Sequence, residues 1–125
     1  MRAESHILPD VLTTGLYAVI CGTAAGNRSA QCGNYYADPR NCFWKTLQQV
    51  KLTPRLEPGE FSTLPKYGLG LTDIAKMASG NDASLPPEVY DVPDFVKRIR
   101  RFRPAIVAFN GKESAYVFYK YYEYL

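Results

Sequence analysis

Two short, uninterrupted apolar runs constrain the fold of this chain more than any other feature. Residues 16–21 (LYAVIC) end at Gly22, and residues 105–109 (AIVAF) end at Asn110-Gly111. Apolar runs of this length, without alternating polar positions, are typical of strands buried on both faces, as in a parallel sheet. We therefore expect two buried strands at the centre of an α/β domain.

Helical spacing of apolar residues appears between and after these two runs. It predicts helices over about 40–50, 94–101 and 113–124. Asp94 is expected to cap the second helix, and the Arg103-Pro104 pair to end it. A short extended segment is predicted over 68–74. The remaining segments are expected to be loops, with room for a short helical turn in the first two: 22–33, 53–66 and 77–94.

Strand–loop–helix units with buried strands predict a three-layer α/β/α sandwich around a mainly parallel central sheet. The length of 125 residues suits a single domain, 1–125. Ligands of such sheets bind at the carboxyl ends of the strands. Three segments leave those ends and are expected to converge on one site: Gly22–Gly33, Thr72-Asp73 and Asn110-Gly111-Lys112.

Composition excludes several classes of protein. Hydrophobic residues make up 46% of the chain and charged residues 22%, which is typical of a globular protein and not of a disordered one. No apolar run approaches the ~18 residues that a membrane span needs. The N-terminus, MRAESHILPD, has no apolar region of the kind found in a secretory signal. We expect no membrane partner.

The cysteines and the histidine argue against a metal site. Cys21, Cys32 and Cys42 form an odd set without a CxxC pair, which favours reduced thiols and a cytoplasmic protein, associated with the nucleoid if it is bacterial. The chain has one histidine, His6, so neither a histidine-based metal site nor a catalytic triad is expected. We predict no metal and no other cofactor.

Basic residues are concentrated in one short segment. Five of the seven residues over 97–103 are cations, and the net charge is +3. This segment is either a stripe that contacts DNA or the solvated face of a helix. The helix is the favoured interpretation, because Phe95, Ile99 and Phe102 mark the opposite face as the buried one.

Four blocks of the sequence resemble a known family. They are LTTGLYAVICGTAAGNRSA, GNYYADPRNCFWKTL, YGLGLTDIAK and RFRPAIVAFNGK, and they cover most of residues 7–120. In order and spacing they resemble the mismatch-specific uracil/thymine DNA glycosylases of the uracil-DNA glycosylase superfamily. The resemblance implies an α/β/α fold, a base flipped out of DNA into a pocket, and metal-free hydrolysis of its N-glycosidic bond. The partner would be DNA containing uracil or a mismatched base.

The sequence departs from this family at two places. Typical members carry G-I-N-P-G in the first block, where the Asn positions the attacking water. Ala24 stands at that position here, and its side chain can neither donate nor accept a proton or a hydrogen bond. The family also has a C-terminal segment with an N-P-S-like loop that wedges into the duplex. The sequence stops at Leu125 without it, so we expect either a fragment or a reduced form.

Asp73 is the candidate for the catalytic role that Ala24 cannot fill. A cation-like sugar in the transition state requires a nearby negative charge and an oriented water, and a carboxylate supplies both. Asp73 follows the short segment predicted at the sheet edge, in a block that the resemblance places at the base pocket. The alternative is that Asp73 caps a helix starting at Ile74. Asp38 is the rival acid, although Asp38-Pro39 is also an ordinary turn signal.

The loop after the first strand is expected to bind substrate. Gly22, Thr23 and Ala24 are small enough to let a ligand approach backbone N–H groups, although a tight strand-to-helix turn would use the same residues. This loop matches neither the dinucleotide-binding nor the phosphate-loop motif.

The resemblance implies roles for further residues. It matches Tyr36 to the aromatic that stacks on the flipped base, a contact worth roughly 1–3 kcal/mol, and Ser29 to a position near the pocket and a DNA phosphate. Asn41 could bind in the pocket or cap the next helix.

A second group of candidates follows the last predicted strand. Lys112, after Asn110 and Gly111, suits a phosphate contact beside a helix N-terminus, and the alternative for it is a solvated lysine.

Three functions remain open from the sequence. The leading hypothesis is a monomeric, monofunctional DNA glycosylase acting on uracil or a related damaged base. The second is a nucleic-acid-binding module that kept the base pocket but lost catalysis, which Ala24 favours. The third is an unrelated nucleotide-binding α/β enzyme, which would need glycines where Ala24 and Ala25 stand.

Overall fold

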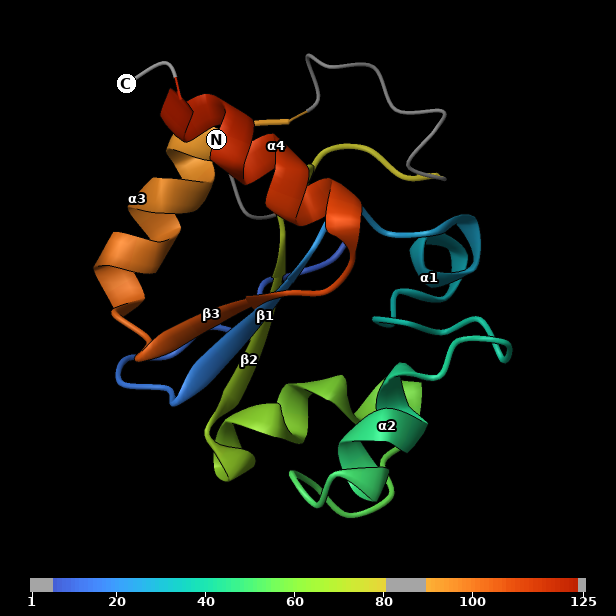
Figure 1. The fold of residues 1–125 in the computed structure, drawn as a ribbon. Helices are drawn as coiled ribbons and strands as arrows, with labels where there is room; N and C mark the ends of the chain where they lie inside the picture. The colour runs from blue at the N-terminus through green and yellow to red at the C-terminus, as the bar shows by residue number, and fades with distance from the viewer. Residues whose placement is uncertain (1–5, 81–89, 124–125) are drawn as a thin grey trace.

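A three-stranded parallel sheet forms the centre of the computed structural model, which describes residues 6–80 and 90–123 (Figure 1). Strand β1 (Ala18–Gly22) lies between β2 (Leu69–Asp73) and β3 (Ile106–Phe109). In the register of the sheet, Gly22 pairs with Asp73 and Cys21 pairs with both Thr72 and Phe109. Because the strands are parallel, their carboxyl ends meet at one edge.

Helices cover both faces of this sheet, which confirms the predicted α/β/α class. Helices α3 and α4 lie over one face, and α2 and η2 lie on the other side (Figure 1). The helical segments are α1 (Asn27–Cys32), α2 (Phe43–Gln49), the 3₁₀ helix η2 (Pro58–Tyr67), α3 (Val92–Phe102) and α4 (Lys112–Glu123). Segments α1 and η2 are the helical turns for which the loops over 22–33 and 53–66 left room.

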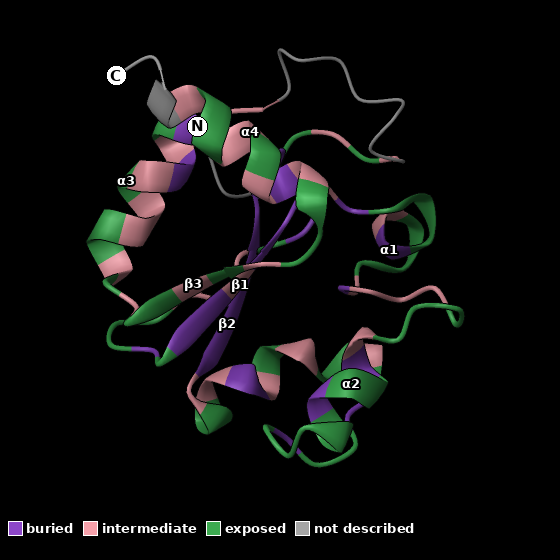
Figure 2. Cartoon of the chain, in the orientation of Figure 1, coloured by how far each residue is buried: buried purple, intermediate pink, exposed green. Residues whose placement is uncertain are grey.

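Each face of the sheet has its own apolar core. On one side, Trp44 and Leu47 of α2 and Leu64 of η2 pack with Leu69 and Leu71 of β2. On the other side, the buried residues are Cys21, Ile74, Val92 and Phe95. Figure 2 shows β1 and β2 buried along most of their length, as the unbroken apolar run at 16–21 predicted for the first strand.

The prediction of a fully buried strand over 105–109 is wrong. Burial alternates along β3, where Ile106 is 44% exposed and Ala108 is exposed as well. Within the described residues β3 pairs only with β1, so it is an edge strand of this sheet. A groove of about 420 Å³ beside Ala108 and Phe109 leaves one face of the strand uncovered. An unbroken apolar run cannot by itself distinguish a central strand from an edge strand.

Two helix starts differ from the prediction. Asp91, and not Asp94, caps α3: its carboxylate accepts a hydrogen bond from the backbone N–H of Asp94 at 3.0 Å, and the helix begins at Val92. Of the loop predicted over 77–94, residues 81–89 lie outside the described part of the chain. Helix α2 begins at Phe43, because the preceding backbone is held in turns by the side chains of Asp38 and Asn41, which accept from Arg40 N–H and Phe43 N–H.

No helix in the described part of the chain is both long enough and apolar enough to cross a membrane.

Gly70 permits the close approach of the N-terminal segment to β2. Val11 exchanges two backbone hydrogen bonds with Leu71, of 2.9 and 3.0 Å. A Cβ atom on Gly70 would lie 2.4 Å from the carbonyl oxygen of Val11 and 2.6 Å from Leu16 Cδ1. Both neighbours are tightly packed, so Gly70→Ala would have to push the segment away.

We predict that Gly70→Ala lowers the free energy of unfolding by about 1–3 kcal/mol, the usual cost of an overpacked site, in a urea titration of the whole chain. Gly59→Ala is the control, because the nearest atom to a Cβ on Gly59 is 3.9 Å away. Equal midpoints for the two variants would contradict this account of Gly70.

Candidate functional site

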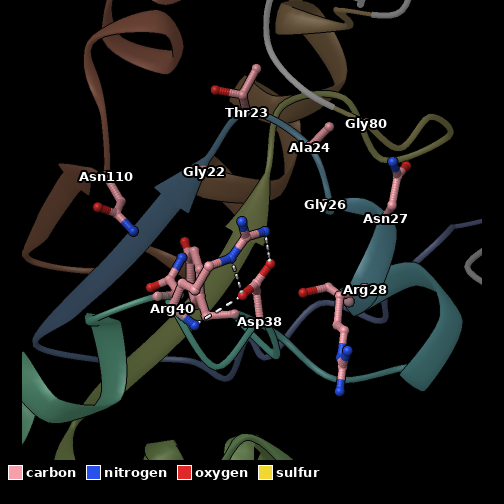
Figure 3. Close-up of a pocket in the computed structure, with 13 residues that line it drawn as sticks. Gly22, Thr23, Ala24, Gly26, Asn27, Arg28, Asp38, Arg40, Gly80 and Asn110 are labelled. Atoms are coloured by element: carbon pink, nitrogen blue, oxygen red, sulfur yellow. Dashed lines mark hydrogen bonds and ion pairs between the residues drawn. The ribbon is translucent and has the colours of Figure 1, made fainter.

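An open, polar pocket of about 670 Å³ lies at the carboxyl edge of the sheet (Figure 3). Its wall is formed by the end of β1 and the loop after it, the first three residues of α1, the turn before α2, Gly80 and Asn110. The volume lies within the ~300–1,000 Å³ typical of sites that enclose a small ligand. Two of the three expected segments, those after β1 and β3, therefore contribute to one pocket, whereas Thr72-Asp73 does not line it.

The loop after β1 is fixed by the chain that follows β2. The carbonyl oxygen of Gly22 accepts from Ile74 N–H at 3.1 Å, and that of Thr23 accepts from Ala75 N–H at 2.8 Å. The Ala25 carbonyl also accepts from Gly80 N–H at 2.9 Å. These bonds hold Thr23 and Ala24 at the pocket wall, so this part of the site is built before any ligand binds.

Tyr36 is held in an unusual backbone conformation. Its φ of 51° lies in the left-handed region, which costs a non-glycine residue about 1 kcal/mol or more. Hydrogen bonds on both sides stabilise this turn: Trp44 Nε1 donates to the Tyr35 carbonyl at 3.0 Å, and Ala37 N–H donates to Ser29 Oγ at 3.0 Å. The expected Ser29 therefore supports the pocket from beneath as well as lining it.

The side chain of Tyr36 contacts the pocket with only part of its surface. One face of the ring stacks on Phe43, with centroids 4.0 Å apart and an angle of 28° between the planes. The hydroxyl oxygen is buried and has no hydrogen-bond partner of good geometry among the described residues. Burial, and next the Asp73 carboxylate, raise the pKa of this hydroxyl, while the nearby Asn110 side chain opposes part of the rise.

Asp73 lies directly behind the pocket floor. It ends β2 opposite Gly22 and is 4% exposed. A Cβ atom on Gly22 would lie 2.7 Å from Asp73 Oδ1 and 3.1 Å from Tyr36 Oη, so the absence of a side chain at Gly22 gives these two groups their space. Both Gly22 and Tyr36 line the pocket, whereas Asp73 does not line it and lies behind these two residues.

The carboxyl group of Asp73 holds its proton more tightly than an ordinary aspartate. Burial raises its pKa to about 6, against the opposing effect of Lys76 and Arg98 and with a further rise due to Asp10. A pKa in this range suits a general base near neutral pH. The alternative that Asp73 caps a helix starting at Ile74 is wrong, because residues 74–77 form a bend and a turn.

The rival acid Asp38 lines the pocket but is engaged by a neighbour. Arg40 binds it through two guanidinium contacts, of 3.1 and 2.8 Å, and through its backbone N–H at 2.9 Å. The side-chain hydrogen bond from Arg40 holds the pKa of Asp38 well below its usual range. A carboxylate this acidic is a weak base, so the two acids at the site have different chemistry.

The remaining predicted residues divide into two groups. Asn41 and Asn110 line the pocket. The Asn41 carboxamide oxygen also accepts from Phe43 N–H at 2.8 Å, so it starts α2 as well. Gly111 and Lys112 are not among the lining residues; both are exposed, and Lys112 is the first residue of α4.

Sequence reasoning missed two arginines of this pocket. Arg28 and Arg40 line it and are exposed (Figure 3). Both were close to predicted site residues, one beside Ser29 and the other beside Asn41, and that adjacency was the available signal. With Asp38 the only lining carboxylate among the described residues, the wall carries more positive than negative charge.

Neither metal ligands nor reactive thiols are evident at this site. Within residues 6–80 and 90–123, no group of three or more His, Cys, Asp or Glu side chains could hold a metal ion. All three cysteines are free thiols, and burial raises the pKa of Cys21.

The chain was compared with models of known protein families. The model of the uracil DNA glycosylase superfamily matches residues 9–124. This match spans the whole sheet and includes every residue that lines the pocket.

We predict that Asp73→Asn stabilises the protein at neutral pH. The raised pKa means that the folded state binds the Asp73 proton more tightly than the unfolded chain, so wild-type stability falls as the pH rises from about 4 to about 6. The loss amounts to about 3 kcal/mol. The advantage of the variant should therefore be larger at pH 7.5 than at pH 4, by urea unfolding at both values. A constant difference between the proteins would contradict the raised pKa.

Proposed function

The chain belongs to the uracil DNA glycosylase superfamily, and from this membership we propose that it excises uracil, or a related mispaired or damaged base, from DNA. The reaction is hydrolysis of the N-glycosidic bond after the nucleotide has been flipped into the pocket. One observation carries the proposal: the buried carboxyl group of Asp73 lies directly behind the floor of a polar pocket at the carboxyl edge of the sheet, where burial raises its pKa to about 6.

Asp73 is proposed as the general base. A water at the pocket floor, between Gly22 and Tyr36, would give its proton to the Asp73 carboxylate as its oxygen bonds to C1′ of the sugar. The N-glycosidic bond breaks, and the base leaves with the bonding electron pair. The negative charge of Asp73 also stabilises the positive charge that develops on the sugar.

Within the superfamily, the mismatch-specific uracil/thymine glycosylases are the proposed relatives. They carry an Asn at the position of Ala24, where it positions the water. Ala24 lies on the pocket wall, but its methyl group cannot bind water. We propose that Asp73 performs this task from the neighbouring strand. Asp73 pairs with Gly22 on the neighbouring strand, and Ala24 follows Gly22 by two residues.

The other pocket residues are proposed to bind the substrate. Tyr36 and Asn41 are suited to contact the flipped base, and Ser29 and Arg28 a flanking phosphate. Because Phe43 already covers one face of the Tyr36 ring, Tyr36 has only its other face and its edge for the base. Lys112 is proposed as a further phosphate contact outside the pocket.

A binding module without catalytic activity is the second candidate. The observation that favours it is the position of Asp73, which is 4% exposed and does not itself line the pocket. If no water reaches the carboxylate, the pocket would hold a flipped base without hydrolysing it. The two candidates differ in one measurable outcome, the release of the base.

The catalytic role of Asp73 predicts a specific loss. Asp73→Asn should reduce single-turnover excision of uracil by about 10²–10⁴-fold, because an amide cannot accept the proton of water. Affinity for the same oligonucleotide should remain close to that of the wild type. The assay uses single- and double-stranded uracil oligonucleotides, followed by alkaline cleavage of abasic sites.

Asp38→Asn is the matched control, and it should lose much less activity than Asp73→Asn. The opposite ranking would move the catalytic role to Asp38. No excision by the wild type from uracil, hypoxanthine or mismatched-thymine substrates would favour the binding module.

The proposed phosphate contact of Lys112 predicts a loss that does not depend on sequence. Lys112→Ala should weaken binding about equally for all oligonucleotides and should reduce the slope of log K against log[salt] by about 1. Lys66→Ala is the control: Lys66 is also exposed, but it precedes β2 and therefore lies at the opposite edge of the sheet. A loss confined to uracil-containing DNA, or equal slopes for all proteins, would exclude this role.

A further inference from the structure

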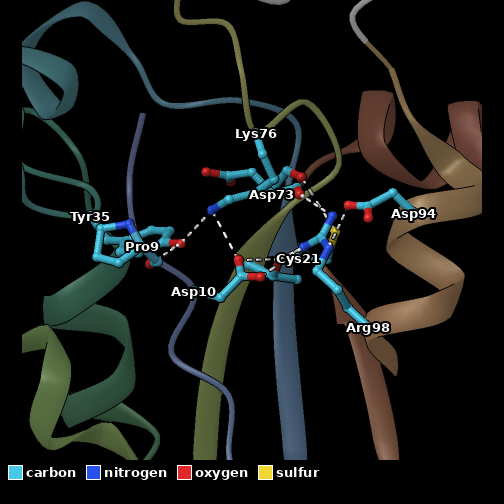
Figure 4. Close-up of polar contacts among 10 residues, drawn as sticks. Pro9, Asp10, Cys21, Tyr35, Asp73, Lys76, Asp94 and Arg98 are labelled. Carbon is cyan, nitrogen blue, oxygen red and sulfur yellow. Dashed lines mark hydrogen bonds and ion pairs between the residues drawn. The ribbon is translucent and has the colours of Figure 1, made fainter. Parts of the chain in front are cut away.

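Figure 4 shows a network of charged side chains beside Asp73, of which Lys76 is buried and the others are partly buried, and which takes no part in the proposed proton transfer. Asp10, from the N-terminal segment, binds Lys76 Nζ through Oδ1 at 2.9 Å and Arg98 Nη1 through Oδ2 at 3.1 Å. It also accepts from Thr72 Oγ1 at 2.7 Å. The side chain of Lys76 is only 2% exposed, and those of Arg98 and Asp10 are 12% and 16% exposed.

The same network anchors the residues around Asp73. Arg98 Nη2 donates to the backbone carbonyl of Asp73 at 3.2 Å, and Arg98 Nη1 also contacts Thr72 Oγ1. Lys76 donates to Tyr35 Oη at 3.0 Å, and that hydroxyl donates to the Pro9 carbonyl at 2.8 Å. The contacts of Asp10 and its two cations thus reach the end of β2, the turn that carries Tyr36, and α3.

Charge counting shows why Asp10 matters to Asp73. The cluster holds two cations, Lys76 and Arg98, and three carboxylates. Asp10 binds both cations, and Asp94 binds Arg98 Nε at 3.0 Å. Buried charges are stable only when they are paired, so these contacts satisfy the cations. An ionised Asp73 is the third carboxylate of the cluster, and its charge is the unbalanced one.

We propose that Asp10 is a positioning residue for Asp73. It engages Lys76 and Arg98, so that these cations hold the end of β2 in place without neutralising the Asp73 carboxylate, and it thereby sets the pH range in which Asp73 can take up a proton. This inference rests on the proposed function for its catalytic meaning. Its physical content, the control of the Asp73 charge by Asp10, is independent of any activity.

The groups that face Asp73 from the surrounding elements are consistent with this role. Lys76 and Arg98 lower its pKa and Asp10 raises it, after the larger rise caused by burial.

Three other titratable neighbours carry no charge that competes with this effect. Cys21 from β1 and Tyr35 and Tyr36 from the turn before α2 all have raised pKa values for which burial is the main cause, so they stay neutral near pH 7. Asp94 acts through Arg98, and His6 has a lowered pKa caused first by burial and next by Lys76.

Two substitutions that remove charges of opposite sign distinguish this role from a purely structural one. Asp10→Asn keeps the shape and removes the negative charge, so the titration of Asp73 should move to lower pH by about one unit. Lys76→Met removes the positive charge and keeps an unbranched side chain of similar length, so the titration of Asp73 should move to higher pH. A residue that merely supports the fold would lower stability in both variants without moving the titration in opposite directions.

The experiment is a ¹³C NMR titration of the Asp73 carboxyl in the full chain, assigned with Asp73→Asn. Glu57→Gln is the charge-matched control, because Glu57 belongs to an ion pair with Arg55 whose side chains are 61% and 70% exposed; it should not move the titration. Thermal unfolding establishes that each variant is folded. If Asp10→Asn does not fold, the direction of the shift in Lys76→Met decides the question.

Shifts of opposite direction support the inference even if the wild type excises no base, in which case only the proposed function fails. If the enzyme is active, the acid limb of its kcat/KM profile should move with the titration in each variant. An unchanged Asp73 titration in folded Asp10→Asn, or a downward shift in Lys76→Met, would overturn the inference.

Discussion

The parallel pairing of β1 with β2 is the constraint on which the site depends. It sets Gly22 opposite Asp73, and the missing side chain of Gly22 leaves room for the carboxyl and for the Tyr36 hydroxyl. The backbone bonds from Ile74 and Ala75 then fix the loop after β1 against the same strand end. A pocket wall and a buried acid therefore come from one piece of sheet geometry.

The buried carboxylate of Asp73 lowers the free energy of unfolding when it is ionised. An ionised carboxylate at 4% exposure is unfavourable unless it is paired, and the neighbouring cations are already bound by Asp10 and Asp94. Residues tuned for chemistry often destabilise the fold that holds them. The left-handed backbone of Tyr36 is a second strained feature of the same pocket. Both features lie at the carboxyl edge of the sheet, beside the pocket.

Local patterns revealed much of the fold but only part of the site. The apolar run at 16–21 and the helical spacing around Trp44 and Phe95 predicted buried elements that the structure contains. The exposure of β3 was missed because an apolar run carries no information about its neighbours in the sheet. Two of the three expected site segments, those after β1 and β3, contribute residues to the pocket because parallel strands end at one edge, but Thr72-Asp73, Gly111 and Lys112 do not line it.

The charge network could not have been predicted. Asp10 and Asp73 are 63 positions apart in the sequence. Neither Asp10 nor Lys76 stands in a pattern that marks it as buried, and their contact arises only from the folded chain. The burial that raises the pKa of Asp73 has the same origin.

The central claim is that Asp73, with its raised pKa, is the base of a hydrolytic reaction at this pocket. The most direct measurement is the pH dependence of single-turnover uracil excision by the wild-type chain. Ionisation of Asp73 predicts a rate that rises tenfold per pH unit at acid pH and levels off above about pH 6. A rate that is independent of pH between 4.5 and 7.5 would contradict the claim.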